Sequence, residues 1–169
     1  AAALLMLDLV VPRKGPLVLL ALLGLAVPLA FSIALWRDLD TAGVVENADI
    51  LADTLAVDRF ALFFKFLFLG VAAAVILVSS DYARRFRRFQ IEFYALLLFS
   101  VTGMMLLASA VELITLYIAL ELTALPVAAL AAFNRDSRSS ESGMKFLILS
   151  GISSAVLLYG MVLVYGFTG

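Results

Sequence analysis

The sequence predicts an all-α protein, a polytopic bundle of transmembrane helices. Of its 169 residues, 64% are apolar and 15% are charged, and the mean hydropathy is +1.12. A typical soluble domain is about 45–50% apolar, and a chain of this size has too little interior to shield more than that from water. Disorder is excluded as well, because it requires low hydrophobicity and high charge. Several apolar runs are long enough to cross a bilayer, which takes roughly 20 residues.

The charged and reactive residues limit the kinds of chemistry that the chain can carry out. Lys and Arg number 12 and Asp and Glu number 13, so the net charge of −1 argues against a nucleic-acid partner. The sequence holds 0 cysteines and 0 histidines. Disulfides, haem–histidine ligation, Cys/His zinc sites and histidine-based triads are therefore excluded, and we expect no metal site. Any chemistry must use Asp, Glu, Lys and Arg.

The apolar runs predict about five full helices plus one partial helix in a single transmembrane domain, residues 1–169. Residues 1–11 are too few to cross, and we expect them to be the tail of a helix cut at its start. The full helices are predicted at about 16–36, 60–80, 91–109, 111–133 and 141–167.

The boundaries follow from the polar residues. The segment 38–58 is acidic and is expected to be an exposed loop, and 134–140 is expected to be a short basic loop. The apolar run 91–133 is too long for one crossing, so a tight turn is predicted at Ala108–Glu112. Lys65 is expected to snorkel to the outer interface.

The basic residues predict the orientation. Three connections hold eight Lys and Arg residues, and the alternating connections hold three. The positive-inside rule then places the richer side in the cytoplasm, and the amino terminus outside the inner (plasma) membrane. The eight are Arg13, Lys14, Arg84, Arg85, Arg87, Arg88, Arg135 and Arg138.

Glu121 is the main candidate for function. It lies nine residues after Glu112 and fourteen before Arg135, so it is near mid-membrane, roughly 13 Å and 21 Å from the two ends. Tyr117 shares its helix face. Pro126 has no N–H and frees a carbonyl one turn earlier, which opens the backbone near the carboxylate to water. Glu121 is either a proton carrier or a structural residue fixed by a hydrogen bond.

Lys145 is the second candidate. It follows Glu141 by four residues, in the order that favours a helix ion pair, so one interpretation is a surface pair at the cytoplasmic end. The other is a proton-loading residue. Ser153 and Gly160 fall near the same face and would suit a hydrated path leading inward.

Two long segments carry a family resemblance. The segment ELTALP lies within residues 93–133, and ESGMKFLILSG lies within residues 139–169. Together with the tight turn between two helices, they resemble subunit N of the proton-pumping NADH:quinone oxidoreductase, respiratory complex I. The early LLMLDLVVPRK, residues 4–14, is similar to the end of that family's first helix.

The resemblance implies an antiporter-like fold with inverted repeats and broken helices, of which this chain would be an amino-terminal fragment. The family's mid-membrane glutamate falls on Glu121, and its lysine near the start of the sixth helix falls on Lys145. In relatives the glutamate pairs with a lysine on the following broken helix, which this chain does not reach.

The implied function is proton translocation, driven by quinone reduction elsewhere in the complex. The chain would be a translocase subunit without a redox centre and would bind no cofactor, while NADH and quinone are used by other parts. Its partners would be other membrane subunits of complex I, lipid and protons. Three alternatives remain open: a subunit of a multi-subunit sodium/proton antiporter, a non-catalytic membrane scaffold, and a relative that takes electrons from ferredoxin.

Overall fold

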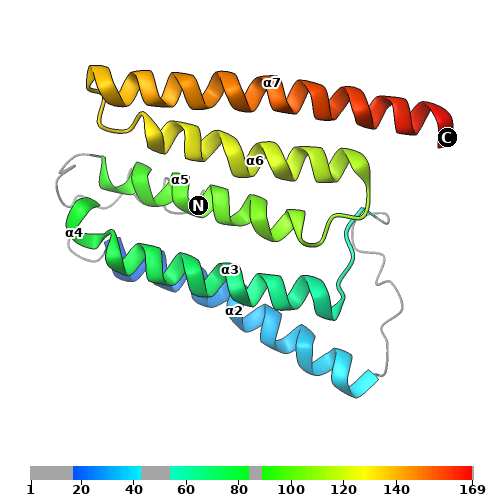
Figure 1. Cartoon of the computed structure of the whole chain (residues 1–169). Coiled ribbons are helices and arrows are strands. Elements are labelled where there is room, and N and C mark those ends of the chain that lie inside the picture. The colour runs from blue at the N-terminus through cyan, green and yellow to red at the C-terminus, as the bar shows by residue number, and fades with distance from the viewer. Residues whose placement is uncertain (1–16, 43–53, 84–88, 169) are drawn as a thin grey trace.

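The computed structural model describes residues 17–42, 54–83 and 89–168, which form helices joined by short connections (Figure 1). Five of these helices are long and apolar enough to cross a membrane, so the predicted all-α, multi-span class is confirmed. The predicted partial helix over 1–11 lies outside the described residues. The helices are α2 (Leu17–Ala42), α3 (Arg59–Val78), α4 (Ser80–Ala83), α5 (Gln90–Leu107), α6 (Leu113–Ala131) and α7 (Ser137–Thr168).

The predicted bounds of the second to fifth full helices need different degrees of correction. α3, α5 and α6 begin and end within two residues of the predicted 60–80, 91–109 and 111–133. α7 begins at Ser137 and not at 141, because the Asp136 carboxylate accepts a hydrogen bond from the Ser139 backbone N–H at 2.7 Å and caps the new helix.

Two other predictions about connections were wrong. The predicted helix 16–36 continues to Ala42, since residues 37–42 contain no glycine or proline that would end it. The short helix α4 lies in the connection between the predicted helices 60–80 and 91–109, where no helix was expected.

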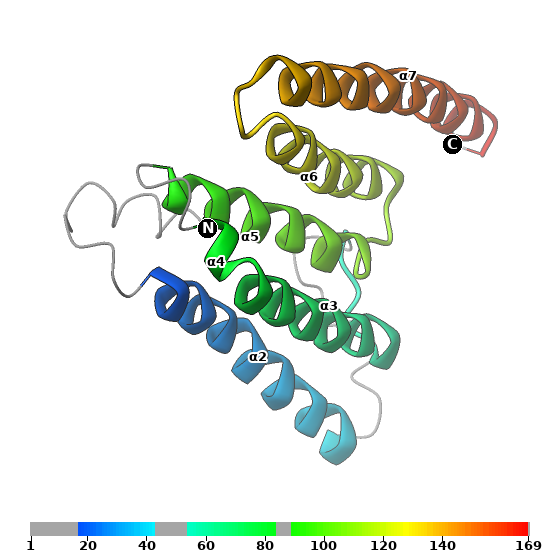
Figure 2. The ribbon, with the colours of Figure 1, turned by 60° about the vertical axis from the view of Figure 1, so that its left-hand side comes forward.

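The long helices run up and down in sequence order. Figures 1 and 2 show α3, α5, α6 and α7 following one another across the bundle, with α2 beside α3. The buried core lies among α2, α3 and α5 and includes Ala21, Leu25, Leu69, Ile76 and Tyr94. α7 forms the edge beyond α6, and Gly143 is the one buried residue among those described in α7. Apart from the half-buried Met161, the other apolar side chains of α7 are exposed and could face lipid or a partner.

The α5–α6 hairpin is packed at backbone distance. A Cβ atom built on Gly103 of α5 would lie 2.6 Å from the Thr123 backbone nitrogen of α6, so only glycine fits there. The Ser100 hydroxyl donates to the Thr123 carbonyl oxygen at 3.1 Å. Small residues and interhelical hydrogen bonds are the usual basis of helix association in membranes, where no hydrophobic force drives it.

The α5–α6 turn is tied to the segment before α3. The Ala56 N–H donates to the Ser109 carbonyl oxygen at 2.8 Å, and the Val111 N–H donates to the Thr54 carbonyl oxygen at 3.1 Å. These bonds flank an antiparallel bridge between Leu55 and Ala110. Residues 54–57, which we call the strap, are half-buried. This part of the predicted exposed loop is therefore packed against the bundle.

Candidate functional site

Glu121 lies in the middle of α6, on the side that faces α7. Two close approaches show which side of this helix faces each neighbour: Thr123 meets Gly103 of α5, and Ala132, the residue that caps the end of α6, meets Gly143 of α7. At 3.6 residues per turn, Glu121 lies about 20° from the direction of Ala132 and roughly opposite to Thr123. The side chain is half-buried in the described chain.

The Glu121 carboxylate forms no hydrogen bond or ion pair with any described residue. Pro126, five residues on, is buried within α6. Tyr117, one turn before Glu121, is half-buried and lines an apolar groove of about 220 Å³ between α6 and α7, together with Leu158 and Met161. The carboxylate is thus placed at a helix–helix interface with its hydrogen-bonding capacity open.

The side of α7 that faces α6 can be identified from which of its residues are shielded from solvent. Within Ser137–Thr168, the residues that are not exposed recur at intervals of four and seven, the spacing of a seam between two packed helices. We call this set the α7 seam, and its members are Ser139, Gly143, Ser150, Ser154 and Met161. Three of the five carry a hydroxyl group, so the interface beside Glu121 has polar groups on the α7 side.

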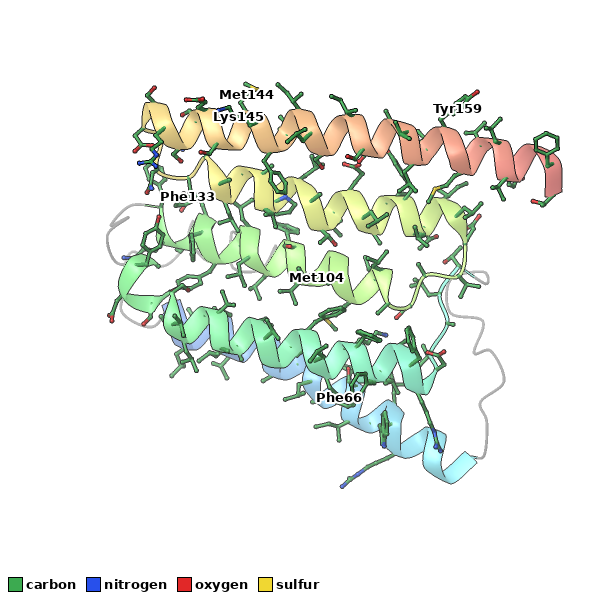
Figure 3. The ribbon with its side chains drawn as sticks, viewed as in Figure 1. Phe66, Met104, Phe133, Met144, Lys145 and Tyr159 are labelled. Carbon is green, nitrogen blue, oxygen red and sulfur yellow. The ribbon has the colours of Figure 1, made fainter. Side chains whose placement is uncertain are left out.

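Lys145 forms an ion pair with Glu141 on the surface of α7. The two side chains are 69% and 62% exposed. Lys145 lies about 200° around the helix from Gly143, so it is directed away from α6. Figure 3 places it on the early turns of α7, near the end of the bundle that holds Phe133. The structure does not bring Lys145 and Glu121 together.

The predicted polar stripe also lies elsewhere. Ser153 is exposed, whereas its neighbour Ser154 and the earlier Ser150 belong to the α7 seam. Sequence reasoning missed these two serines because it started from the face of Lys145. The signal that finds them is their spacing from Gly143, which the packing against Ala132 fixes as the inner face.

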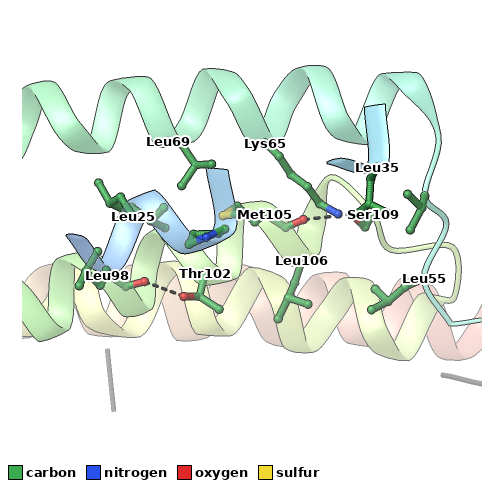
Figure 4. Close-up of a pocket in the computed structure, with 14 residues that line it drawn as sticks. Leu25, Leu35, Leu55, Lys65, Leu69, Leu98, Thr102, Met105, Leu106 and Ser109 are labelled. Carbon is green, nitrogen blue, oxygen red and sulfur yellow. Dashed lines mark hydrogen bonds between the residues drawn. The ribbon is translucent and has the colours of Figure 1, made fainter. Parts of the chain in front are cut away.

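Lys65 lies beside the largest part of the space between α2, α3 and α5. Its side chain is half-buried and lines a cavity of about 400 Å³ formed by α2, α3, α5 and the strap. Figure 4 shows it among Leu35, Leu69, Met105 and Ser109. The cavity is mainly apolar, and Thr102 donates its hydroxyl hydrogen within α5, to the Leu98 carbonyl oxygen at 2.8 Å.

Comparisons with known proteins show which families the chain is similar to. Residues 110–169 match the family described as NADH:quinone oxidoreductase/Mrp antiporter, TM. The chain is 44% identical over 160 residues, 93% of its length, to NADH-quinone oxidoreductase subunit N of Desulfitobacterium hafniense, covering 30% of that protein. It is 39% identical over 170 residues, 99% of its length, to subunit N of Trichlorobacter lovleyi, covering 33% of it.

The resemblance to subunit N is confirmed. A third relative, subunit N of Dehalococcoides mccartyi, is 48% identical over 114 residues, which are 68% of the chain and 24% of that protein. The chain thus spans about a quarter to a third of the length of these curated subunit N proteins.

Among the described residues, no group of three or more acidic side chains could hold a metal ion.

Proposed function

We propose that the chain is part of a proton-translocating, antiporter-like subunit of NADH:quinone oxidoreductase. It would lie in the inner (plasma) membrane with its amino terminus outside and would contact other membrane subunits of the complex and lipid. The five long apolar helices and the similarity to subunit N proteins support this proposal. The chain would bind no cofactor, since NADH and quinone would be used by other parts of the complex.

The observation that carries the proposal is the position of Glu121. A carboxylate costs about 2.5–3.5 kcal/mol at the centre of a membrane helix even on the lenient insertion scale, so it needs a compensating role. Glu121 lies at the middle of α6, at the α6–α7 interface, without a fixed partner among the described residues. A group with this placement can gain and lose a proton, whereas a permanently clamped carboxylate cannot do so readily.

Lys145 would take part at the cytoplasmic end. Its ammonium group is exposed and forms an ion pair with Glu141, so it is open to water at this end of α7. Its role would be to supply protons toward the interior, while Glu121 would act as the carrier at mid-membrane. Tyr117 and Pro126, which lie on α6 with Glu121, would support this path.

The test compares Glu121→Gln and Glu121→Ala in the full-length subunit within the assembled complex. Proton uptake into inverted vesicles is measured per NADH oxidised, and Glu112→Gln is the control, because Glu112 is an exposed glutamate at the start of the same helix. We expect both Glu121 variants to lower the proton yield while the control keeps it. A normal yield in both Glu121 variants contradicts the assignment.

A sodium/proton antiporter subunit is the second candidate, because the description of the matched family names such antiporters too. The two functions differ in what drives transport. Vesicles that carry out sodium-dependent proton exchange without NADH oxidation would support the antiporter. Proton uptake that requires NADH and quinone, and continues without sodium, would support the oxidoreductase subunit.

A further inference from the structure

The packing of α7 on α6 places Ser154 level with Glu121. Gly143 of α7 lies against Ala132, the residue that caps the end of α6, and the two helices run in opposite directions from this contact (Figure 1). Eleven residues, about three turns, lead back along α6 to Glu121 and forward along α7 to Ser154. Both positions lie about 20° from the direction of the contact, so the two side chains belong to facing sides of the interface.

The groove at the far end of the two helices supports this register. Tyr117 and Leu158 line the same groove, and each lies four residues beyond the Glu121–Ser154 level. The register of α6 against α7 is therefore the same at this groove as at the contact of Gly143 with Ala132. Exposure agrees with it: Ser154 is half-buried, while Ser153 and Ala155 on either side of it are exposed.

Both groups have unused hydrogen-bonding capacity. Other hydroxyls in these helices donate to the carbonyl oxygen four residues earlier, as Thr123 does to Ala119 at 2.9 Å and Ser142 does to Arg138 at 2.9 Å. Neither the Ser154 hydroxyl nor the Glu121 carboxylate has a hydrogen bond with any described residue. In a bilayer there is no bulk water to satisfy such groups, so leaving both without partners is costly.

We propose that Ser154 is a positioning residue for Glu121. Its hydroxyl hydrogen bonds to the Glu121 carboxyl, directly or through one water molecule, and holds that group in the α6–α7 interface. The inference rests on the proposed function. It adds that the α7 seam is the polar surface against which the Glu121 side chain is held. Ser150, one turn nearer to the α6–α7 turn, is the next hydroxyl on this surface.

The experiment follows the Glu121 carboxyl itself by infrared difference spectroscopy of the assembled complex, with acid and alkaline samples compared. The band that disappears in Glu121→Gln belongs to the protonated Glu121 C=O group. Ser154→Ala is expected to move this band to higher frequency, because loss of a hydrogen bond strengthens the C=O bond. Ser154→Thr keeps a hydroxyl and is expected to restore the original frequency.

The comparison variant is Ser153→Ala, which removes a hydroxyl from the exposed face of the same turn and is expected to leave the band in place. The proposal is overturned if Ser154→Ala leaves the Glu121 band unmoved, or if Ser153→Ala moves it and Ser154→Ala does not. These outcomes are independent of the proton yield. If Glu121→Gln pumps normally, the proposed function fails, whereas the band position still decides whether Ser154 holds Glu121.

Discussion

The Ser100 hydroxyl on α5 donates a hydrogen bond to the Thr123 carbonyl oxygen on α6 at 3.1 Å, one turn from the point where Gly103 meets Thr123. Together, the bond and the glycine bring two backbones to van der Waals contact two residues away from Glu121. The α5 side of α6 is therefore fixed by tight packing. The α7 side, where Glu121 lies, has fewer buried residues and more polar groups.

The first prediction concerns this close approach. Gly103→Val is expected to destabilise the α5–α6 hairpin, by about 1–3 kcal/mol, because the new side chain must push Thr123 away. The readouts are the thermal stability of the complex in detergent and the yield of assembled complex. Gly70→Val is the control, since a Cβ atom at Gly70 meets nothing within 4 Å. Equal stability of the two variants would show that the contact contributes nothing.

The second prediction concerns the α6–α7 register. The chain has 0 cysteines, so the pair Tyr117→Cys and Leu158→Cys can be tested for disulfide formation without background from this chain. Because both residues line one groove, we expect efficient cross-linking. Adding Gly143→Val is expected to reduce the yield, because its side chain would collide with Ala132.

Gly151→Val is the matched control for that experiment. It lies in the same helix, and a Cβ atom at Gly151 meets nothing within 4 Å, so the cross-linking yield should not change. A yield that falls equally in both valine variants would mean that helix propensity, and not the contact with Ala132, is responsible.

The third prediction concerns the start of α3. The Asp58 carboxylate accepts a hydrogen bond from the Ala61 backbone N–H at 2.7 Å and caps the helix. Asp58→Ala is expected to lower the stability by about 1 kcal/mol, whereas Asp58→Asn keeps an acceptor and should cost less. Thermal unfolding of the complex in detergent measures both. If Asp58→Asn costs as much as Asp58→Ala, the negative charge matters more than the cap.

The fourth prediction separates two roles of Lys145. As an exposed ion pair, Lys145 and Glu141 should show a coupling energy of about 0.3–0.5 kcal/mol in a double-mutant cycle on stability. If Lys145 also supplies protons, Lys145→Ala should lower the proton yield per NADH more than Glu141→Ala does. Equal yields for the two variants would leave the ion pair as the whole function of Lys145.

The sequence was informative wherever long apolar runs ended in unmistakable polar residues. The break at Ala108–Glu112 and the bounds of α3, α5 and α6 could be predicted, because a bilayer limits how long an apolar helix can be. The end of α2 and the start of α7 could not be placed in this way, since polar residues outside the bilayer are compatible with helix. Asp136 caps the start of α7, but an aspartate beside Asn134 and Arg135 is equally typical of a loop.

The sequence was enough to predict the key residue of the site, but not which side chains surround it. The mid-membrane position of Glu121 follows from counting residues along one helix. Which serine faces it depends on where the neighbouring helix lies, and Ser153 and Ser154 differ by only 100° in direction. That direction is decided by the contact of Gly143 with Ala132, which involves two small residues of a kind that are common throughout this sequence.

The strap has a mechanical consequence. Its two backbone hydrogen bonds connect the segment before α3 with the α5–α6 turn, which are more than fifty residues apart in sequence. A displacement of the α5–α6 hairpin along its axis would therefore pull on α3 from the same end. Inserting a few glycines between Ala56 and Asp58 would loosen this connection, and α3 and the α5–α6 hairpin would then move separately under force.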